Sequence, residues 1–460
     1  MVLSSMINGM NFKEKLVAEF SNLKDGQLRS YFGERLLQVK ENSFHKFEKV
    51  GLPTLKHEEW KYTSLNFLNQ IDFSLNNKKY EKAYRSESNF LNHLNGENYN
   101  LIHLINGNLA NKRIESRNGT VDLIHFAENP LENFDFDLYS IFEKNFIDDS
   151  NPFGYLNTAF FSDGFKLVVA DNVELPEPII LVFSYDNELP LFTNSLNFIK
   201  IGENSKVNLV VVFENPSSGK IFANETINIL QEPNSQFEIS FVQNNIPSLY
   251  LINNINLVQQ ENTYSKSNTV SLSARFVRNN LNVSFDGEHS EAHLNGIYFV
   301  DDDELVDDHT VIQHNKPNCL SNENFRGILD GKSRAVFNGK IFVARNAQKT
   351  NAYQSNKNIL LSDEARINSK PQLEIYADDV KCTHGATAGY LDREMLFYIE
   401  SRGISKEKAK SLLLNSFVSE NIEQIELPEL RDSIKEEIAK KLHLEDIFFC
   451  STIDEITKTF

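Results

Sequence analysis

The chain has 460 residues, with 46 Lys and Arg against 64 Asp and Glu, so its formal net charge at pH 7 is -18. A surface with this excess of carboxylates repels phosphate backbones and anionic lipid headgroups, which argues against nucleic acid or a membrane as partner. The longest apolar stretches, such as residues 178–185, are far shorter than the roughly 20 residues that a membrane-spanning helix needs.

Residues 1–65 are predicted to form an N-terminal helical region. The first residues lack a targeting pattern, so we expect a cytoplasmic protein. Gly51 and Pro53 end the helical pattern, and Trp60, the only tryptophan, follows. Two apolar stripes with the spacing of a helix face precede them: Phe12, Leu16, Phe20 and Leu23, then Leu28, Phe32, Leu36 and Val39. Residues 66–165 are Asn-rich, are assigned to a mixed α/β segment, and carry no recognised motif.

Residues 166–389 are predicted to form an all-β domain. Short segments of alternating polarity are separated by Asn, Asp, Gly and Ser, without a helical pattern between them. A sandwich would show frequent Asn-Gly or Asp-Gly hairpin turns, and only FNGK at 337–340 and LDGK at 329–332 are clear examples. Similar phrases, ENSKVNLVVVF and PNSQFEISFV, begin at residues 203 and 233. This recurrence favours a right-handed parallel β-helix, a solenoid, over a sandwich.

Residues 390–460 return to a helical pattern and are predicted to form a C-terminal helical region. Asp392 and Ser405 are placed to cap two helices, and Gly403 is placed to end the first of them. A third helix is expected to begin near Pro428. Its apolar side carries Leu430, Ile434, Ile438 and Leu442.

Three short stretches carry residue types found in functional motifs. GILDGKS at 327–333 has three residues between its glycines instead of the four of a phosphate-binding P-loop, so Lys332 and Ser333 are interpreted as turn residues and no nucleotide site is expected. HSEAH at 289–293 and DDDELVDDHTVIQH at 301–314 are rich in Asp and His. His309 and His314 differ by five positions, so on a regular strand they would face opposite sides, and most of this charge is interpreted as solvated.

KCTHGATAG at 381–389 places Cys382 and His384 on one face of a strand. A cysteine protease needs a thiol of lowered pKa, whereas the acids before Cys382 would raise it. A zinc or iron site needs about four ligands, and this strand offers two, so another subunit would have to supply the rest. From spacing alone, a buried thiol beside a hydrogen-bonded histidine is as good an interpretation as half a metal site.

Four blocks resemble the SufB/SufD family of the SUF iron–sulfur cluster assembly machinery, in its SufD form. They are residues 51–65 (GLPTLKHEEWKYTSL), 309–329 (HTVIQHNKPNCLSNENFRGIL), 337–365 (FNGKIFVARNAQKTNAYQSNKNILLSDEA) and 373–417 (LEIYADDVKCTHGATAGYLDREMLFYIESRGISKEKAKSLLLNSF). The likeness is diffuse between the first block and about residue 270.

The resemblance implies a non-enzymatic scaffold with a β-helix between helical ends. The β-helix would pair with a SufB-like paralogue, and the C-terminal helices would bind a SufC-like ATPase. Cys382 and His384 would lend ligands to iron or a nascent Fe–S cluster at the SufB interface. The residues expected to contact the SufC-like partner are Asp392, Phe397, Tyr398, Ser401, Arg402, Gly403, Ala409, Leu413 and Phe417.

Three alternatives stay open. In the SufB form, acidic residues flank the aligned histidine, whereas Thr383 and Gly385 flank His384 here. A β-solenoid enzyme acting on an acidic polysaccharide would use clustered acids, for which residues 301–308 are the candidate run. The isolated chain is also compatible with a homodimer.

Overall fold

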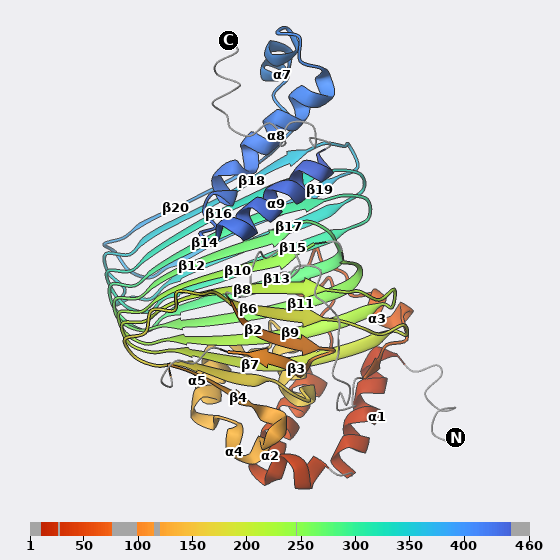
Figure 1. The fold of residues 1–460 in the computed structure, drawn as a ribbon, viewed down its shortest axis with the longest axis vertical. Coiled ribbons are helices and arrows are strands. Elements are labelled where there is room, and N and C mark those ends of the chain that lie inside the picture. The colour runs from red at the N-terminus through yellow and green to blue at the C-terminus, as the bar shows by residue number, and fades with distance from the viewer. Residues whose placement is uncertain (1–10, 26–27, 76–98, 115–119, 245, 443–460) are drawn as a thin grey trace.

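The computed structural model describes residues 11–25, 28–75, 99–114, 120–244 and 246–442, and Figure 1 shows their arrangement. A parallel β-solenoid of about 8 turns occupies residues 166–389, with helices before and after it. The alternating pattern therefore predicts the fold class correctly. None of the helices in the described ranges is long and apolar enough to cross a membrane.

Each turn of the solenoid, called a rung below, contributes one strand to each of two 10-stranded sheets. Sheet A has the strand order β19-β17-β15-β13-β11-β9-β7-β5-β4, and sheet B has the order β20-β18-β16-β14-β12-β10-β8-β6-β2-β3. The sheet A strands are β1 (Ser74–Leu75), which pairs with β7 off this path, β4 (Val121–His125), β5 (Phe165–Val169), β7 (Leu191–Ile201), β9 (Ile221–Gln231), β11 (Ile246–Gln259), β13 (Ala274–Phe285), β15 (Leu305–His314), β17 (Arg334–Val343) and β19 (Arg366–Ile375). The sheet B strands are β2 (Asn100–Ile105), β3 (Asn108–Arg113), β6 (Ile179–Ser184), β8 (Lys206–Glu214), β10 (Gln236–Gln243), β12 (Tyr264–Ser271), β14 (Glu291–Val300), β16 (Leu320–Leu329), β18 (Asn351–Leu360) and β20 (Lys381–Gly389).

The recurring phrases mark the turns that lead from sheet A to sheet B. In each of these turns from β5 to β18 one residue has a positive φ, where Asn is favoured over most other residues with a side chain: Asn172, Asn204, Asn234, Asn262, His289, Asn318 and Lys349. From Asn204 onward the next residue is buried and is Ser or Thr in every turn except one: Ser205, Ser235, Thr263, Ser290, Cys319 and Thr350. Cys319 thus occupies the place of a small hydroxyl residue in a structural column.

The two expected hairpin signals have other roles. FNGK lies in the middle of β17, so its interpretation as a turn is wrong. Its glycine, Gly339, faces the interior, where a Cβ atom would lie 2.1 Å from the amide nitrogen of Gln354. LDGK does form a turn around Gly331, whose φ is 57°. That turn joins β16 in sheet B to β17 in sheet A, so it continues the solenoid and makes no hairpin.

The helices that precede the solenoid cover the outer face of sheet A. Buried aromatic side chains from both predicted helical stripes, such as Phe12 and Phe32, pack there against sheet residues such as Phe192 and Phe198. The side chains of Leu23 and Leu28 lie outside the described part. The elements are α1 (Phe12–Asp25), α2 (Leu28–Val50, kinked at Gly33), η1 (Glu58–Trp60), α3 (Phe67–Gln70), β1 (Ser74–Leu75), η3 (Phe126–Glu128), α4 (Pro130–Asn133), α5 (Phe136–Phe146) and α6 (Pro152–Phe160).

The segment at 66–165 also adds strands to both sheets of the solenoid. β2 pairs in parallel with β6, and β3 pairs antiparallel with β2. β4 pairs antiparallel with β5. The mixed segment is therefore continuous with the first rungs of the solenoid.

The three C-terminal helices are α7 (Arg393–Glu400), α8 (Lys406–Ile422) and α9 (Pro428–Lys441). The side chains of Asp392 and Ser405 cap α7 and α8, as expected, and Pro428 begins α9. α8 and α9 lie on the outer face of sheet B, where Leu414 and Ile434 pack against valines and isoleucines of the strands. α7 projects beyond the last rung, at the end of the solenoid opposite to α1 and α2 (Figure 1).

Candidate functional site

Cys382 and His384 lie on β20, which is the last strand of sheet B. In the strand register Cys382 is beside Ala352, and His384 is beside Gln354. Ala352 and Gln354 are buried inside the solenoid, with 0% and 3% of their surfaces exposed. Because residues in register on parallel strands share a face, both candidate ligands point to the inner side of the last rung.

Cys382 and His384 provide two donors for a metal. In the described ranges, no group of three or more His, Cys, Asp and Glu side chains is arranged to hold a metal ion. Burial raises the pKa of the Cys382 thiol, against a hydrogen bond with the Ala352 backbone, so the thiol is protonated at neutral pH. A protonated thiol is a poor nucleophile, which weighs against the cysteine protease interpretation. The pair fits half of a four-ligand site.

A buried polar group lies behind His384. Gln354 donates a hydrogen bond of 2.6 Å from Nε2 to Glu323 Oε2 on the preceding rung. Thr310, across the interior in sheet A, donates a second one of 3.0 Å to the same oxygen. Burial raises the pKa of Glu323 to about 7, against the hydrogen bonds from Gln354 and Thr310, which favour the carboxylate. Sequence analysis missed both residues, although polar residues at inward positions of the alternating pattern were the available signal.

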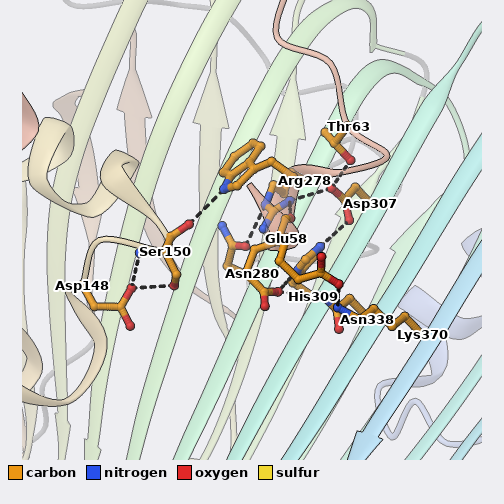
Figure 2. Close-up of polar contacts among 12 residues, drawn as sticks. Glu58, Thr63, Asp148, Ser150, Arg278, Asn280, Asp307, His309, Asn338 and Lys370 are labelled. Atoms are coloured by element: carbon orange, nitrogen blue, oxygen red, sulfur yellow. Dashed lines mark hydrogen bonds and ion pairs between the residues drawn. The ribbon is translucent and has the colours of Figure 1, made fainter. Parts of the chain in front are cut away.

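A second polar cluster lies on the outer face of sheet A, where the block at 51–65 reaches the solenoid (Figure 2). Trp60 is 1% exposed, and its indole Nε1 donates a 2.9 Å hydrogen bond to the Ser150 carbonyl. The guanidinium of Arg278 lies 3.7 Å from the centre of the Trp60 ring. The same guanidinium forms a 2.7 Å ion pair with Asp307, and both partners are almost fully buried.

Asp307 is the centre of this outer cluster. Its carboxylate accepts hydrogen bonds from Arg278 and Thr63, and His309 Nε2 lies 2.9 Å from its other oxygen. Burial acts to raise the pKa of Asp307, but the charge of Arg278 and the contacts with His309 and Thr63 outweigh it and lower the pKa to about 2. Asp307 is therefore ionised at neutral pH, and the cluster fastens the N-terminal region to β13 and β15.

A polar groove with a volume of about 460 Å³ lies beside this cluster on the outer face of sheet A. Its walls include Glu59, Asp148, Asn282, Lys340 and Glu374. Lys340 and Glu374 form a 2.7 Å ion pair across two strands, so these opposite charges neutralise each other.

The residues of the Asp- and His-rich stretches are dispersed. His289 is an exposed turn residue, and His293 pairs with Glu291 at 2.6 Å. His309 belongs to the outer cluster, whereas His314 lies inside the solenoid, 2.9 Å from Ser321. The prediction that His309 and His314 face opposite sides is confirmed. Lys332 and Ser333 are turn residues followed by a strand, also as predicted.

The predicted partner contacts divide into two sets. Phe397 and Tyr398 on α7 are 71% and 54% exposed, and Met395 beside them is 52% exposed. Arg402 lies 4.1 Å from the centre of the Tyr398 ring, and Ser401 donates a hydrogen bond to the Tyr398 carbonyl. Asp392 caps the helix, and Gly403 follows it with a φ of 87°. On α8, by contrast, Ala409 is fully buried, and Leu413 and Phe417 are half-buried.

Comparison with known proteins gives two family matches that cover most of the chain. Residues 185–417 match the SufBD core domain of SUF system FeS cluster assembly, and residues 10–181 match the SufBD protein N-terminal region. An iron–sulfur cluster assembly SufBD family protein of Synechocystis sp. is 29% identical over 404 residues, which cover 84% of this chain and 87% of the relative.

Two further relatives have similar coverage. The iron–sulfur cluster assembly protein SufD of Escherichia coli is 26% identical over 402 residues, covering 86% of this chain and 90% of the relative. The chloroplastic protein ABCI7 of Arabidopsis thaliana is 26% identical over 416 residues, covering 88% and 85% of the two chains. With both family models in sequence order along a β-solenoid, this chain belongs to the SufBD family of SUF-system iron–sulfur cluster assembly proteins.

Proposed function

We propose that this chain is a SufD-type scaffold subunit that works in the cytoplasm, pairs with a SufB-like paralogue and binds a SufC-like ATPase. Its contribution to chemistry would be two ligands, Cys382 and His384, for iron or a nascent Fe–S cluster that is cargo of the complex. The observation that carries the proposal is their shared inward face on the last strand of sheet B. A half-site at the end of a solenoid is available to a second subunit that covers that end.

The strand edges support this mode of pairing. Among the strands that the structure describes, β19 and β20 each bond to one neighbour, so their outer edges present backbone N–H and C=O groups without a strand partner in this part of the chain. Such edges are templates for strand addition by another chain. A covering solenoid would satisfy these groups and bring its own donors next to Cys382 and His384. Thiolate sulfur and imidazole nitrogen are both ligands that iron and Fe–S clusters accept.

The exposed surface of α7 supports the docking of the ATPase. Met395, Phe397 and Tyr398 are exposed apolar side chains on α7, a helix that projects from the body of the protein. Met395 and Tyr398 are three positions apart and share one side of the helix, and Phe397 lies next to Tyr398 around it. Aromatic side chains of this kind are frequent anchors at protein–protein contacts. Ala409 is an unsuitable contact because it is fully buried.

Two observations weigh against the alternatives. The acidic run at 301–308 does not line one face, since Asp307 points outward to Arg278 and Asp308 points inward to Asn279, which argues against a polysaccharide-active enzyme. Thr383 and Gly385 stand where the SufB form carries acids, which favours the SufD form.

Co-expression with SufB-like and SufC-like partners tests the half-site. The complex with Cys382→Ala and His384→Ala should assemble but should lose most of the iron–sulfur absorbance. Thr383→Ala with Thr387→Ala is the matched control, because these side chains lie on the other face of the same strand. If the first pair leaves the absorbance unchanged, the assignment of the two ligands fails.

A separate experiment tests docking on α7. Phe397→Ala with Tyr398→Ala should reduce binding of the SufC-like ATPase at least tenfold without changing the thermal midpoint, because both rings are exposed. Tyr353→Ala, which removes a 42% exposed ring from β18, serves as the control. Deleting the whole C-terminal region is a poor test, because α8 and α9 cover apolar residues of sheet B. ATPase binding at full strength by the double variant would contradict the placement.

A further inference from the structure

Gln354 lies inside the solenoid, directly behind His384. The two residues are in register on the neighbouring strands β18 and β20, and adjacent parallel strands are about 4.8 Å apart. Both side chains point inward, so the Gln354 amide and the His384 imidazole are stacked neighbours on one face. Gln354 is 3% exposed, whereas His384 lies on the exposed last rung.

The amide of Gln354 is fixed from the opposite side. Its Nε2 donates a 2.6 Å hydrogen bond to Glu323, which is itself fully buried and is also held by Thr310. Gly339 provides the space for the amide, since a Cβ atom at that position would lie 2.1 Å from Nε2. Three neighbouring strands therefore cooperate to hold one orientation of the Gln354 side chain.

Oε1, the oxygen of the Gln354 amide, is by contrast buried and has no hydrogen-bond donor in the part of the chain that the structure describes. A buried acceptor without a donor destabilises the folded protein, so a donor that reaches this oxygen is favoured. The nearest side chain in register that carries a suitable N–H group is His384 on the next rung.

Two other amides on β18 show that this is not a general property of the strand. Asn356 and Asn358 also point inward, but they hydrogen-bond with Tyr298, with each other and with the Thr387 carbonyl. Their register neighbours on β20 are Ala386 and Ala388, which have no polar side chain. Gln354 is thus the inward amide of β18 that adjoins a candidate ligand.

We propose that Gln354 is a positioning residue for His384: its Oε1 accepts the N–H of one ring nitrogen and leaves the other nitrogen free for the metal. This inference rests on the proposed function. Hydrogen bonds of this kind set the tautomer and orientation of metal-binding histidines, and their loss commonly lowers metal affinity by 10–100-fold. The partner subunit would then meet a ligand whose direction is already set.

Co²⁺ is a suitable probe, because cobalt–thiolate and cobalt–imidazole coordination has characteristic visible absorption. The complex of this chain with its SufB-like and SufC-like partners would be titrated with Co²⁺ as wild type, Gln354→Met and Gln354→Asn. Both substitutions withdraw the acceptor, one by removing the amide and one by shortening it. We expect each to lower Co²⁺ affinity about 10-fold or more and to shift the visible bands.

Asn358→Leu is the matched control, because it removes a buried amide that does not adjoin His384. Wild-type Co²⁺ affinity and spectra in the folded Gln354 variants, with affinity lost in His384→Ala, would overturn this inference and leave the proposed function intact. An equal loss in Asn358→Leu and the Gln354 variants would also overturn it, because the effect would then be structural. If His384→Ala itself binds Co²⁺ as the wild type does, the half-site fails and the positioning role fails with it.

Discussion

The ion pair between Arg278 and Asp307 makes a quantitative prediction about how the N-terminal region is attached. Asp307→Asn keeps the size of the side chain but leaves the Arg278 guanidinium buried, at 2% exposure, without a counter-charge. Removing one partner of a buried ion pair costs about 3–5 kcal/mol. Because Arg278 lies against Trp60 and bonds to the Glu59 carbonyl, the loss should fall on the contact between residues 51–65 and the solenoid.

The single tryptophan makes this loss directly measurable. Trp60 fluorescence reports on the cluster, and far-UV circular dichroism reports on the whole chain, so urea unfolding can follow both. In Asp307→Asn the fluorescence transition should move to lower urea and precede the circular dichroism transition. Asp303→Asn, on the same acidic stretch but 65% exposed and 3.7 Å from Arg275, should stay within about 0.5 kcal/mol of wild type.

The same ion pair predicts a pH dependence. The pKa of Asp307 is lowered from 3.8 to about 2, so its contribution is complete above pH 4 and is lost as the pH falls from 4 to 2. The shift corresponds to about 2 kcal/mol. An Asp307→Asn variant whose fluorescence transition is unchanged, and whose acid sensitivity equals that of wild type, would refute the attachment through this ion pair.

Other predictions concern the interior of the solenoid. Gly339→Val should lower the free energy of unfolding by about 1–3 kcal/mol, because the added side chain meets the Gln354 amide; a thermal midpoint equal to wild type would contradict this. Cys319→Ser should cost less than about 1.5 kcal/mol in urea unfolding, since Ser occupies this column elsewhere, and Cys319 should resist alkylation at pH 8, because burial raises its pKa to about 11. Burial also raises the pKa of Glu225 to about 7, so its charged form opposes folding increasingly from pH 4.5 to 7. Glu225→Gln should therefore raise the thermal midpoint at pH 8 and leave it nearly unchanged at pH 4. A larger gain at pH 4 than at pH 8 would contradict the conclusion that the charged form of Glu225 opposes folding.

Much of the fold was predictable from the sequence because most contacts in a solenoid lie between adjacent rungs. Each rung repeats the last, so alternation and the recurring Asn-Ser phrases predict both strands and stacking. The asparagines with positive φ, such as Asn204 and Asn234, explain why these phrases recur. FNGK was misleading as a turn signal because Gly339 is required for packing and not for backbone conformation. A side chain at Gly339 would occupy the space that Gln354 fills.

The site was less predictable because its parts come from distant segments. Cys382 and His384 share a strand, so a spacing of two reveals their common face. Gln354 and Glu323 lie one and two rungs behind them, and no spacing in the sequence states the register. Trp60 and Arg278 are still farther apart along the chain, and no pattern in the sequence indicates that they are in contact.

The outer edges of β19 and β20 limit how many copies of this protein can be useful in a cell. Backbone groups at an edge pair with any strand of suitable register, and a second copy of the same chain is such a strand. Surplus chain would therefore cover its edges by self-association, and a homodimer of the isolated chain is one form that this could take. The relative amounts of this chain and its SufB-like paralogue would then determine how many half-sites are completed by the partner subunit.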